Sequence, residues 1–324
     1  MNILSKIKRL LHADIESMNS HIKELTQGRD ELIREVSKHL INSGGKRLRP
    51  ILTLICAKFC EYKGTRHILL AASVEFIHTA TLLHDDVVDE SMLRRGVETA
   101  NNKWGNKASI LVGDFLLSQA FKIMVKDGSL KVLDILSSAS AIIAEGEVMQ
   151  LSSINNLTLN LDQYIEIVKS KTAELFAAAC QIGAVVANSE DKEGPLRDFG
   201  MNLGIAFQII DDGLDYFSND KDIGKSVGDD FREGKITLPV IVAYDKSDKE
   251  EKEFWRNKMN NSERTAEDLI VAINIMNKYS VSKIINEYAS RYINLAKQSL
   301  DIFPQSEIKT LLLEILAFSL KRLY

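Results

Sequence analysis

The chain has 324 residues, of which 45% are hydrophobic and 27% are charged, and its net charge is −4. This length allows one large domain or two ordinary ones with a sizeable core, and the mixed charges argue against nucleic acid or an anionic membrane as a main partner. The cysteines, Cys56, Cys60 and Cys180, lack a zinc-ligand spacing, so we expect reduced core residues in a cytoplasmic protein.

The N-terminal residues, MNILSKIKRLLHADIESMN, are basic and amphipathic. Asp14 and Glu16 interrupt the apolar pattern, so a first helix is predicted rather than a targeting peptide. A weak, reversible contact of this helix with a membrane surface stays open. We find no apolar run of the roughly 18 residues that a membrane span needs.

Apolar residues recur at helical spacing along most of the chain, and only four prolines and seventeen glycines interrupt them. Pro50 is expected in the first helical position of its helix. Longer helices are predicted at 49–62, 67–91, 107–126, 131–153, 161–187, 196–217 and 306–324. No segment is typical of a strand. We therefore expect an all-α fold of about ten to twelve helices, in a single domain over 1–324.

One acidic motif occurs twice: DDVVD at 85–89 is echoed by DDGLD at 211–215, each within an apolar helical pattern. In a helix, positions i and i+4 share a face, so the first and last aspartates of each motif point the same way. Like charges at this spacing repel, and oxygen ligands suit Mg²⁺. A solvated helix face would explain one such cluster, but two copies favour metal binding.

Basic residues that could bind an anion accompany these clusters. GGKRLRP places Lys46, Arg47 and Arg49 just before a predicted helix, where the N-terminus attracts anions. The other candidates follow the clusters or lie between them: Arg94, Arg95, Lys171, Lys225 and Lys235. Each lysine alone is more often a surface residue. Together, acids and bases on apolar helices suggest Mg²⁺ ions that clamp a diphosphate.

The motifs GGKRLRP, HTATLLHDDVVD with LRRG, KTAELF, GIAFQIIDDGLD and EGKITLP occur in this order. In this, the chain resembles the trans-isoprenyl diphosphate synthases (polyprenyl synthetases), most nearly their long-chain octaprenyl and solanesyl branch. The resemblance runs from about residue 40 to the C-terminus, and no motif position is lost. It implies a bundle of helices around a central cavity.

The resemblance also implies a role for each matching residue. The diphosphate of isopentenyl diphosphate should be held by four basic residues: Lys46, Arg49, His78 and Arg95. Mg²⁺ on the allylic diphosphate should be bound by Asp85, Asp89 and Asp211, supported by Asp86, Asp212 and Asp215. The allylic diphosphate should be contacted directly by Arg94, Lys171 and Lys225. Thr172 and Gln208 should line the site beside the reacting carbons.

The reaction that the family implies is a repeated condensation. The allylic diphosphate primer ionises, the double bond of isopentenyl diphosphate attacks the cation, and a proton is lost to the released diphosphate. By this resemblance, the product is an all-trans polyprenyl diphosphate of about C40 for the side chain of a quinone such as ubiquinone. A homodimer is implied, with at most peripheral membrane contact for product release.

Product length is expected to depend on the helix that carries the first aspartates. Short-chain members often carry an aromatic residue five positions before the first aspartate, whereas this chain has Ala80 there. Ile77 lies about one helical turn, or about 5 Å, further along. Ala80 and Ile77 are therefore the predicted chain-length positions. Alternatively, Ala80 merely allows close helix packing.

Three other functions compete with this one. Glu75 and His78 have the Glu-x-x-His spacing of di-iron bundles, but a second copy is lacking. Non-catalytic regulatory subunits of the family typically lose an aspartate or a basic motif, and this chain keeps them. Terpene cyclases ionise similar substrates but usually lack the GGKRLRP site, so its presence favours condensation.

Overall fold

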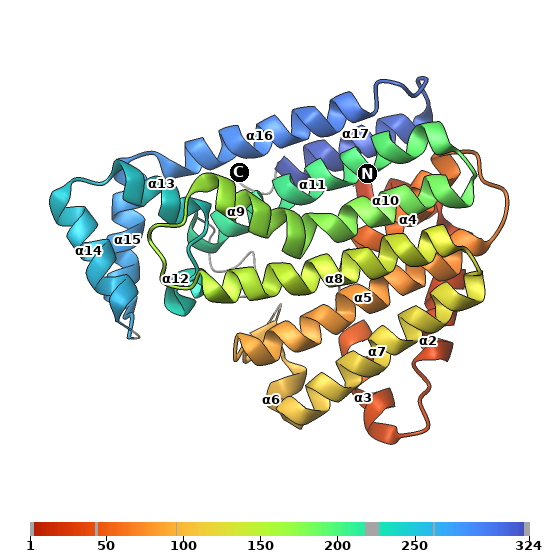
Figure 1. Cartoon of the computed structure of the whole chain (residues 1–324), viewed down its shortest axis with the longest axis horizontal. Helices are drawn as coiled ribbons and strands as arrows, with labels where there is room; N and C mark the ends of the chain where they lie inside the picture. Colours follow the sequence, from red (N-terminus) through yellow and green to blue (C-terminus); the bar gives the residue numbers. More distant parts are fainter. Residues whose placement is uncertain (1–2, 43–44, 95, 218–226, 262, 321–324) are drawn as a thin grey trace. The chain divides into compact units, whose positions relative to one another are not determined.

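The computed structural model describes residues 3–42, 45–94, 96–217, 227–261 and 263–320, and these residues confirm the all-α prediction (Figure 1). The α-helices are α1 (Ile3–Leu10), α2 (His12–Leu25), α3 (Glu31–Asn42), α4 (Leu48–Phe59), α5 (Arg66–Val88), α6 (Ala100–Trp104), α7 (Asn106–Asp127), α8 (Leu130–Ser152), α9 (Leu161–Val168), α10 (Glu174–Val186), α11 (Glu190–Phe217), α12 (Asp229–Glu233), α13 (Leu238–Lys246), α14 (Lys249–Asn260), α15 (Ala266–Lys278), α16 (Val281–Ser299) and α17 (Glu307–Leu320).

The predicted number of ten to twelve helices is too low, because the described residues alone form α1 to α17. Short helices such as α6 and α12 have too few turns to show an apolar period. The prediction that no strand forms is also corrected. Leu93–Arg94 (β1) and Val97–Glu98 (β2) pair antiparallel, with Leu93 opposite Glu98. Two-residue strands are likewise too short for a sequence period.

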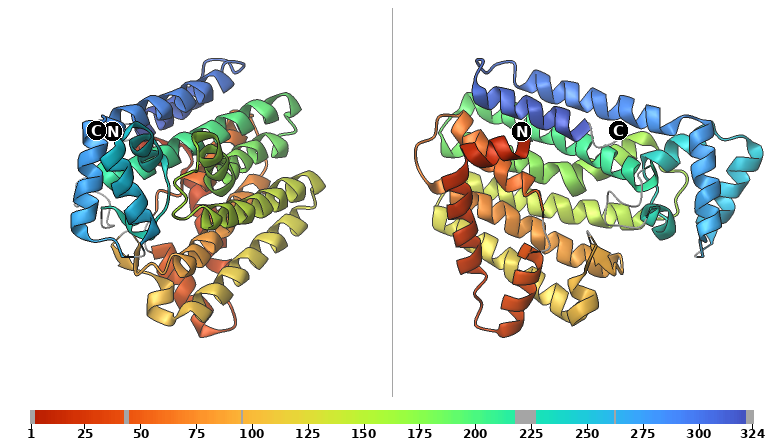
Figure 2. Two further views of the ribbon diagram at one scale, coloured as in Figure 1. Left: turned by 60° about the vertical axis from the view of Figure 1, so that its left-hand side comes forward. Right: turned by 180° about the vertical axis from the view of Figure 1, so that it is seen from behind.

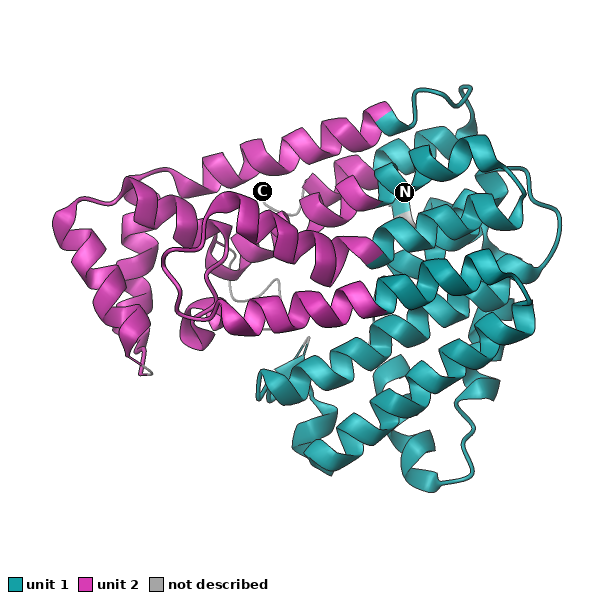
Figure 3. Ribbon diagram, viewed as in Figure 1, with its two compact units in different colours: residues 1–140, 175–200, 299–314 teal, residues 141–174, 201–298, 315–324 magenta. Residues whose placement is uncertain are grey.

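The chain divides into two compact units, which Figure 3 shows in different colours. Unit 1 comprises residues 1–140, 175–200 and 299–314, and unit 2 comprises residues 141–174, 201–298 and 315–324. Both units are therefore built from segments that are distant in the sequence. The single domain over 1–324 stays a prediction.

Helix α5 is the central element of unit 1, where it packs against α2, α4 and α7. Figure 1 shows α5 beside α7, and Figure 2 shows the N-terminal helices from behind. Leu70, Val74 and Ile77 of α5 are at most 1% exposed. A helix that is apolar on most sides is stable only when neighbours cover it. This packing places the first acidic motif at the end of a helix held on several sides.

Helix α7 corrects the expectation that no stretch is long and apolar enough for a membrane span. By length and composition alone α7 could cross a membrane. However, 50% of its most apolar window is buried inside the protein, and α7 packs along α5. The core helices of soluble proteins pass the same test. The packing of α7 in unit 1 explains the buried half of its apolar residues, whereas others, such as Leu111 and Val125, are exposed.

The N-terminal helix α1 also belongs to unit 1. Its apolar side chains Ile3 and Ile7, and the following Leu11, are at most 8% exposed. Lys6 forms an ion pair with Glu314 at 2.9 Å. The apolar face that could contact a membrane surface is therefore covered by the protein itself.

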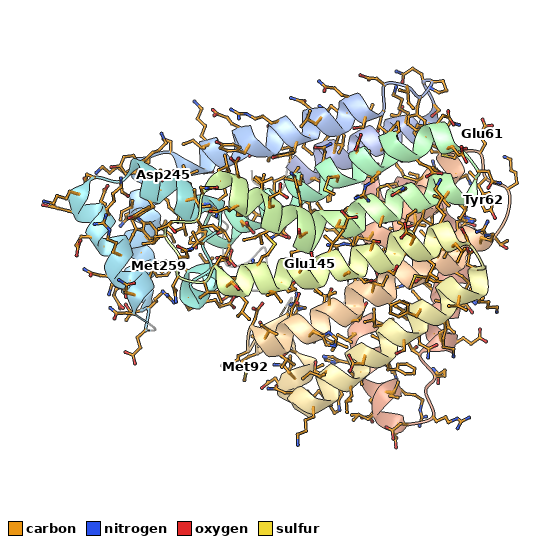
Figure 4. All side chains as sticks on the ribbon, viewed as in Figure 1. Glu61, Tyr62, Met92, Glu145, Asp245 and Met259 are labelled. Carbon is orange, nitrogen blue, oxygen red and sulfur yellow. The ribbon has the colours of Figure 1, made fainter. Side chains whose placement is uncertain are left out.

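The core of unit 2 is centred on aromatic side chains. Trp255 of α14 is fully buried, and Phe231 and Phe254 meet it edge-on at ring-centroid distances of 6.2 and 5.5 Å. Met259, labelled in Figure 4, is 1% exposed in the same core. Edge-to-face contacts of this kind add to the free energy of burial. They fix α12, which follows the second acidic motif in the sequence.

Two glycines in α11 provide a test of the packing in unit 1. A Cβ at Gly200 would lie 2.4 Å from the carbonyl oxygen of Phe176, whereas a Cβ at Gly194 would meet nothing within 4 Å beyond its chain neighbours, one of which is Pro195. We predict that Gly200→Ala lowers the free energy of unfolding by about 1–3 kcal/mol, because the backbone must shift. Gly194→Ala, the matched control, should change it by less than about 1 kcal/mol, because the gain in helix propensity is opposed by the following Pro195, which disfavours a helical residue with a Cβ before it. Urea denaturation measures both, and equal effects would contradict the close packing.

Candidate active site

The first acidic cluster lies at the C-terminal end of α5. Asp85 and Asp89 are half-buried, and the amide of Asp89 donates to the carbonyl of Asp85 at 2.8 Å. The C-terminal end of a helix carries partial negative charge, which is unfavourable for carboxylates, and the two aspartates also repel each other. A bound cation would relieve both effects. The oxygen donors and their shared helix face fit a hard divalent ion.

The middle aspartate of this cluster, Asp86, has other partners. It is 1% exposed, and its Oδ1 accepts hydrogen bonds from Nε and Nη2 of Arg94 at 2.8 and 2.7 Å. Asn101 Nδ2 donates to the Asp86 carbonyl at 3.0 Å. These bonds tie β1 and α6 to the end of α5. Asp86 thus supports the cluster by holding Arg94 beside it.

The GGKRLRP segment leads into α4, which begins at Leu48, two residues earlier than predicted from Pro50. Lys46 is exposed just before the helix. Arg49 lies 3.1 Å from His78 Nε2 through its Nη1, and its guanidinium stacks 4.3 Å from the centroid of Phe176. The aromatic face and the imidazole hold this cation in one orientation. Unit 1 therefore brings Arg49 and His78 together, and Lys46 precedes the helix that carries Arg49; their binding of an anion stays a prediction.

The second acidic cluster lies in the last turns of α11, in unit 2. Asp211 and Asp215 are half-buried, whereas Asp212 is 5% exposed. Asp215 Oδ2 accepts the amide of Asp230 at 3.1 Å, and its carbonyl accepts the amide of Gly228 at 2.8 Å. As in α5, the carboxylates stand at the negative end of a long helix.

Asp212 is the centre of a buried hydrogen-bond network. Tyr164 donates to its Oδ2 at 2.6 Å, and Gln208 Nε2 donates to its Oδ1 at 2.7 Å. Thr172 in turn donates to Gln208 Oε1 at 2.8 Å. Burial, together with the charge of Asp230, raises the pKa of Asp212 to about 7. With both oxygens engaged, Asp212 orients Gln208 and, through it, Thr172.

A π-helical turn, η1 (Lys169–Ala173), interrupts the helix predicted at 161–187. Lys171 lies on it, and its Nζ contacts Glu147 Oε2 at 2.6 Å and Gln150 Oε1 at 2.8 Å. A Cβ at Gly146 would be 2.6 Å from the amide nitrogen of Lys171, so α8 can approach this turn closely only with glycine there. Wide turns of this kind are frequent at functional sites. The continuous helix in the prediction is corrected accordingly.

The comparisons with known proteins agree with these motifs. The family model described as polyprenyl synthetase matches residues 30–276. The octaprenyl diphosphate synthase of Escherichia coli K12 is 43% identical over 274 residues, which cover 84% of this chain and 85% of the relative.

The chain belongs to the polyprenyl synthetase family.

Solved structures extend this relationship to the three-dimensional fold. A decaprenyl diphosphate synthase from Rhodobacter capsulatus has a TM-score of 0.94 and 42% identity, covering 99% of each chain. A polyprenyl synthase from Caulobacter crescentus CB15, solved with calcium and isoprenyl diphosphate, has a TM-score of 0.95 and 44% identity, covering 98% of this chain and 97% of its own. This polyprenyl synthetase is therefore a trans-prenyltransferase.

The predicted site residues fall into three sets. Unit 1 carries Lys46, Arg49, Ile77, His78, Ala80, Asp85, Asp86, Asp89 and Arg94, and unit 2 carries Lys171, Thr172, Gln208, Asp211, Asp212 and Asp215. Arg95 and Lys225 lie outside the described residues. Within the described part of the chain, no three His, Cys, Asp or Glu side chains already form a metal site.

Sequence reasoning missed three residues of this polyprenyl synthetase: Glu147, Gln150 and Tyr164. Their partners, Lys171 and Asp212, lie 21 to 48 residues away in the sequence. Glu147 and Gln150 are three apart and share a helix face, but this spacing is common on solvated helices. Only the packing of α8 and α9 within unit 2 identifies their role.

Tyr164→Phe tests the network around Asp212. The variant leaves a buried carboxyl group without one hydrogen bond, so we predict a loss of about 1–3 kcal/mol in the free energy of unfolding. The matched control is Tyr244→Phe, which removes a hydroxyl that accepts a surface bond from Arg256 at 3.3 Å and should cost under about 0.5 kcal/mol. Chemical denaturation compares the two. Equal stability of Tyr164→Phe and wild type would show that the network contributes nothing.

Proposed function

We propose that this polyprenyl synthetase condenses isopentenyl diphosphate repeatedly onto an allylic diphosphate primer, with Mg²⁺ as cofactor. The observation that carries the proposal is the pair of acidic clusters at the ends of α5 and α11, together with two basic side chains that carboxylates hold in place, Arg94 by Asp86 and Lys171 by Glu147. The octaprenyl and decaprenyl diphosphate synthases among the relatives support a long-chain product, for which we propose about C40 and a use as a quinone side chain.

In this proposal, Asp85 and Asp89 of α5 hold Mg²⁺ on the allylic diphosphate, and Asp211 of α11 is a further proposed ligand of Mg²⁺. When bound, the metal stabilises the negative charge that develops on the departing diphosphate. Arg94 and Lys171 add fixed positive charge, since Asp86 and Glu147 keep them in place before the substrate arrives. Charges that are already oriented need no reorganisation in the transition state.

Isopentenyl diphosphate is proposed to bind at the segment before α4, where Lys46, Arg49 and His78 hold its diphosphate. Its double bond then attacks the allylic cation, a carbon–carbon bond forms, and the released diphosphate takes the proton. Thr172 and Gln208 are polar side chains whose orientation is set by Asp212. They are proposed to line the site beside the reacting carbons, where apolar neighbours exclude the water that would quench the cation.

The growing tail is proposed to run from Asp85 back along α5. Ala80 and Ile77 are 2% and 1% exposed, so a bulky side chain at Ala80 would occupy space inside the protein. The chain-length role of Ala80 rests on this burial and on its position before the first aspartate. Each isoprene unit spans about one helical turn, or about 5 Å.

We further propose a cytoplasmic homodimer. Helix α7 exposes large apolar side chains that a second copy could cover: Ile110, Leu111, Phe121 and Val125, at 41%, 66%, 39% and 68% exposure. Exposed large apolar side chains that gather on one helix are often covered at protein interfaces. Membrane contact would then be limited to product release. Light scattering that gave the monomer mass of 36.3 kDa would refute the dimer.

One assay tests the function. The purified protein is incubated with isopentenyl diphosphate, Mg²⁺ and each of several allylic primers, and the products are dephosphorylated and sized. We expect a ladder of linear all-trans products that ends near C40, abolished by a chelator. A cyclic product, or a single condensation with every primer, would refute the proposal.

Asp85→Ala tests the metal site. Removal of one charge-stabilising group should cost about 3 kcal/mol or more in the transition state, so we predict that kcat falls by at least about a hundredfold. The fold should survive, because Asp85 is half-buried near solvent. Turnover and circular dichroism are measured together, with the surface variant Asp245→Ala as control. Near-normal turnover of folded Asp85→Ala protein would exclude this cluster from metal binding.

Ala80→Phe tests the path of the tail. The added ring should block the tail after a few condensations, so we predict mainly C15 to C20 products, given about one helical turn per isoprene unit. Consumption of primer should continue, because the block lies away from the carboxylates. Thr79→Phe, one position along α5 and turned by about 100°, is the control and should keep long products. Full-length chains from folded Ala80→Phe protein would show that the growing tail does not pass Ala80.

A further inference from the structure

Arg47 is the basic residue of GGKRLRP to which the proposed function gives no role. It immediately precedes α4, with φ 47° and ψ 45°, a left-handed conformation that is uncommon for any residue other than glycine. Such a conformation persists only where surrounding contacts hold it. The contacts of Arg47 therefore bear on how the segment between Lys46 and Arg49 is oriented.

Two side chains from other helices of unit 1 hold Arg47. Its Nε lies 3.8 Å from Oε1 of Glu75 on α5, and its Nη1 donates a hydrogen bond to Oδ1 of Asn19 on α2. The side chains of Arg47 and Glu75 are only 23% and 16% exposed. Screening by solvent is reduced at this exposure, so the attraction exceeds that of a surface ion pair.

The same face of α5 holds the second arginine of the segment. Glu75 and His78 are three residues apart and lie on one side of the helix. Glu75 contacts Arg47, and His78 lies 3.1 Å from Nη1 of Arg49. Glu75 and His78 have the Glu-x-x-His spacing of half a di-iron motif. Here these two residues instead position two arginines of the basic segment.

We propose that Glu75 is a positioning residue for the isopentenyl diphosphate site. The inference rests on the proposed function, which assigns the diphosphate to Lys46, Arg49 and His78. By fixing Arg47, Glu75 fixes the backbone that joins Lys46 to Arg49, so that both face the same anion. The pairing also neutralises a carboxylate that would otherwise repel that anion.

The direction in which Glu75→Gln changes the KM for isopentenyl diphosphate separates a positioning role from its alternatives. Glu75→Gln keeps the size of the side chain but removes the charge that attracts Arg47. If Glu75 merely competed with the substrate for Arg47, Glu75→Gln would lower the KM for isopentenyl diphosphate. If it only joined α4 to α5, stability would fall and both substrates would be affected alike. If Glu75 is a positioning residue, Glu75→Gln raises the KM for isopentenyl diphosphate and leaves the KM for the primer unchanged.

The experiment measures kcat and the KM of each substrate for Glu75→Gln, Arg47→Gln and the double variant. Glu24→Gln is the matched control, since Glu24 pairs with His21 at the same distance of 3.8 Å but on the surface. We expect Glu75→Gln to raise the KM for isopentenyl diphosphate about tenfold, with the primer KM within about twofold of wild type. The double variant should be no worse than the worse single variant, because both remove one interaction.

An unchanged or lowered KM for isopentenyl diphosphate in Glu75→Gln overturns the inference, as does an equal rise for both substrates. Should Glu75→Gln fail to fold, Glu75→Asp carries the test. It keeps the charge but withdraws it by one methylene group, and it must still raise the KM for isopentenyl diphosphate selectively. Wild type and Glu24→Gln report on the proposed function separately, because that function fails if neither consumes isopentenyl diphosphate.

Discussion

Carboxylates at the negative ends of long helices are the constraint on which the rest of this structure depends. Asp85 and Asp89 at the end of α5, and Asp211 and Asp215 at the end of α11, oppose both the helix dipole and each other. Helices are kept in this arrangement by tertiary packing, not by their own termini. A bound cation would relieve this repulsion, and this supports the proposal that the clusters bind a divalent metal.

The middle aspartates show how the protein separates binding from support. Asp86 is directed to Arg94, and Asp212 is directed to Tyr164 and Gln208. Each is nearly fully buried, where a carboxyl group is costly without partners. The same Asp-Asp dipeptide thus presents one side chain toward the cluster face and anchors the next side chain inside the unit. Both copies of the motif have this arrangement of neighbouring aspartates.

The basic residues, like the middle aspartates, are held in place by other side chains. Arg94 has Asp86, Lys171 has Glu147, and Arg49 has His78 and the face of Phe176. Long cationic side chains lose much conformational freedom when they bind an anion, and partners that restrict them beforehand reduce that loss. A trans-prenyltransferase whose substrate carries its charge on diphosphates benefits directly from such restriction.

The sequence by itself determined the helical class, the positions of most long helices and the residues of the two clusters. Apolar spacing and repeated aspartates are local properties that a linear pattern records. The sequence did not determine the π-helical turn that carries Lys171, the two-residue strands, of which β1 contains Arg94, or the true number of helices. Those depend on contacts such as Gly146 against the Lys171 backbone and Tyr164 with Asp212, which lie 25 to 48 residues apart in the sequence. Only tertiary packing decides which polar group faces which, because many side chains share each spacing and burial selects among them.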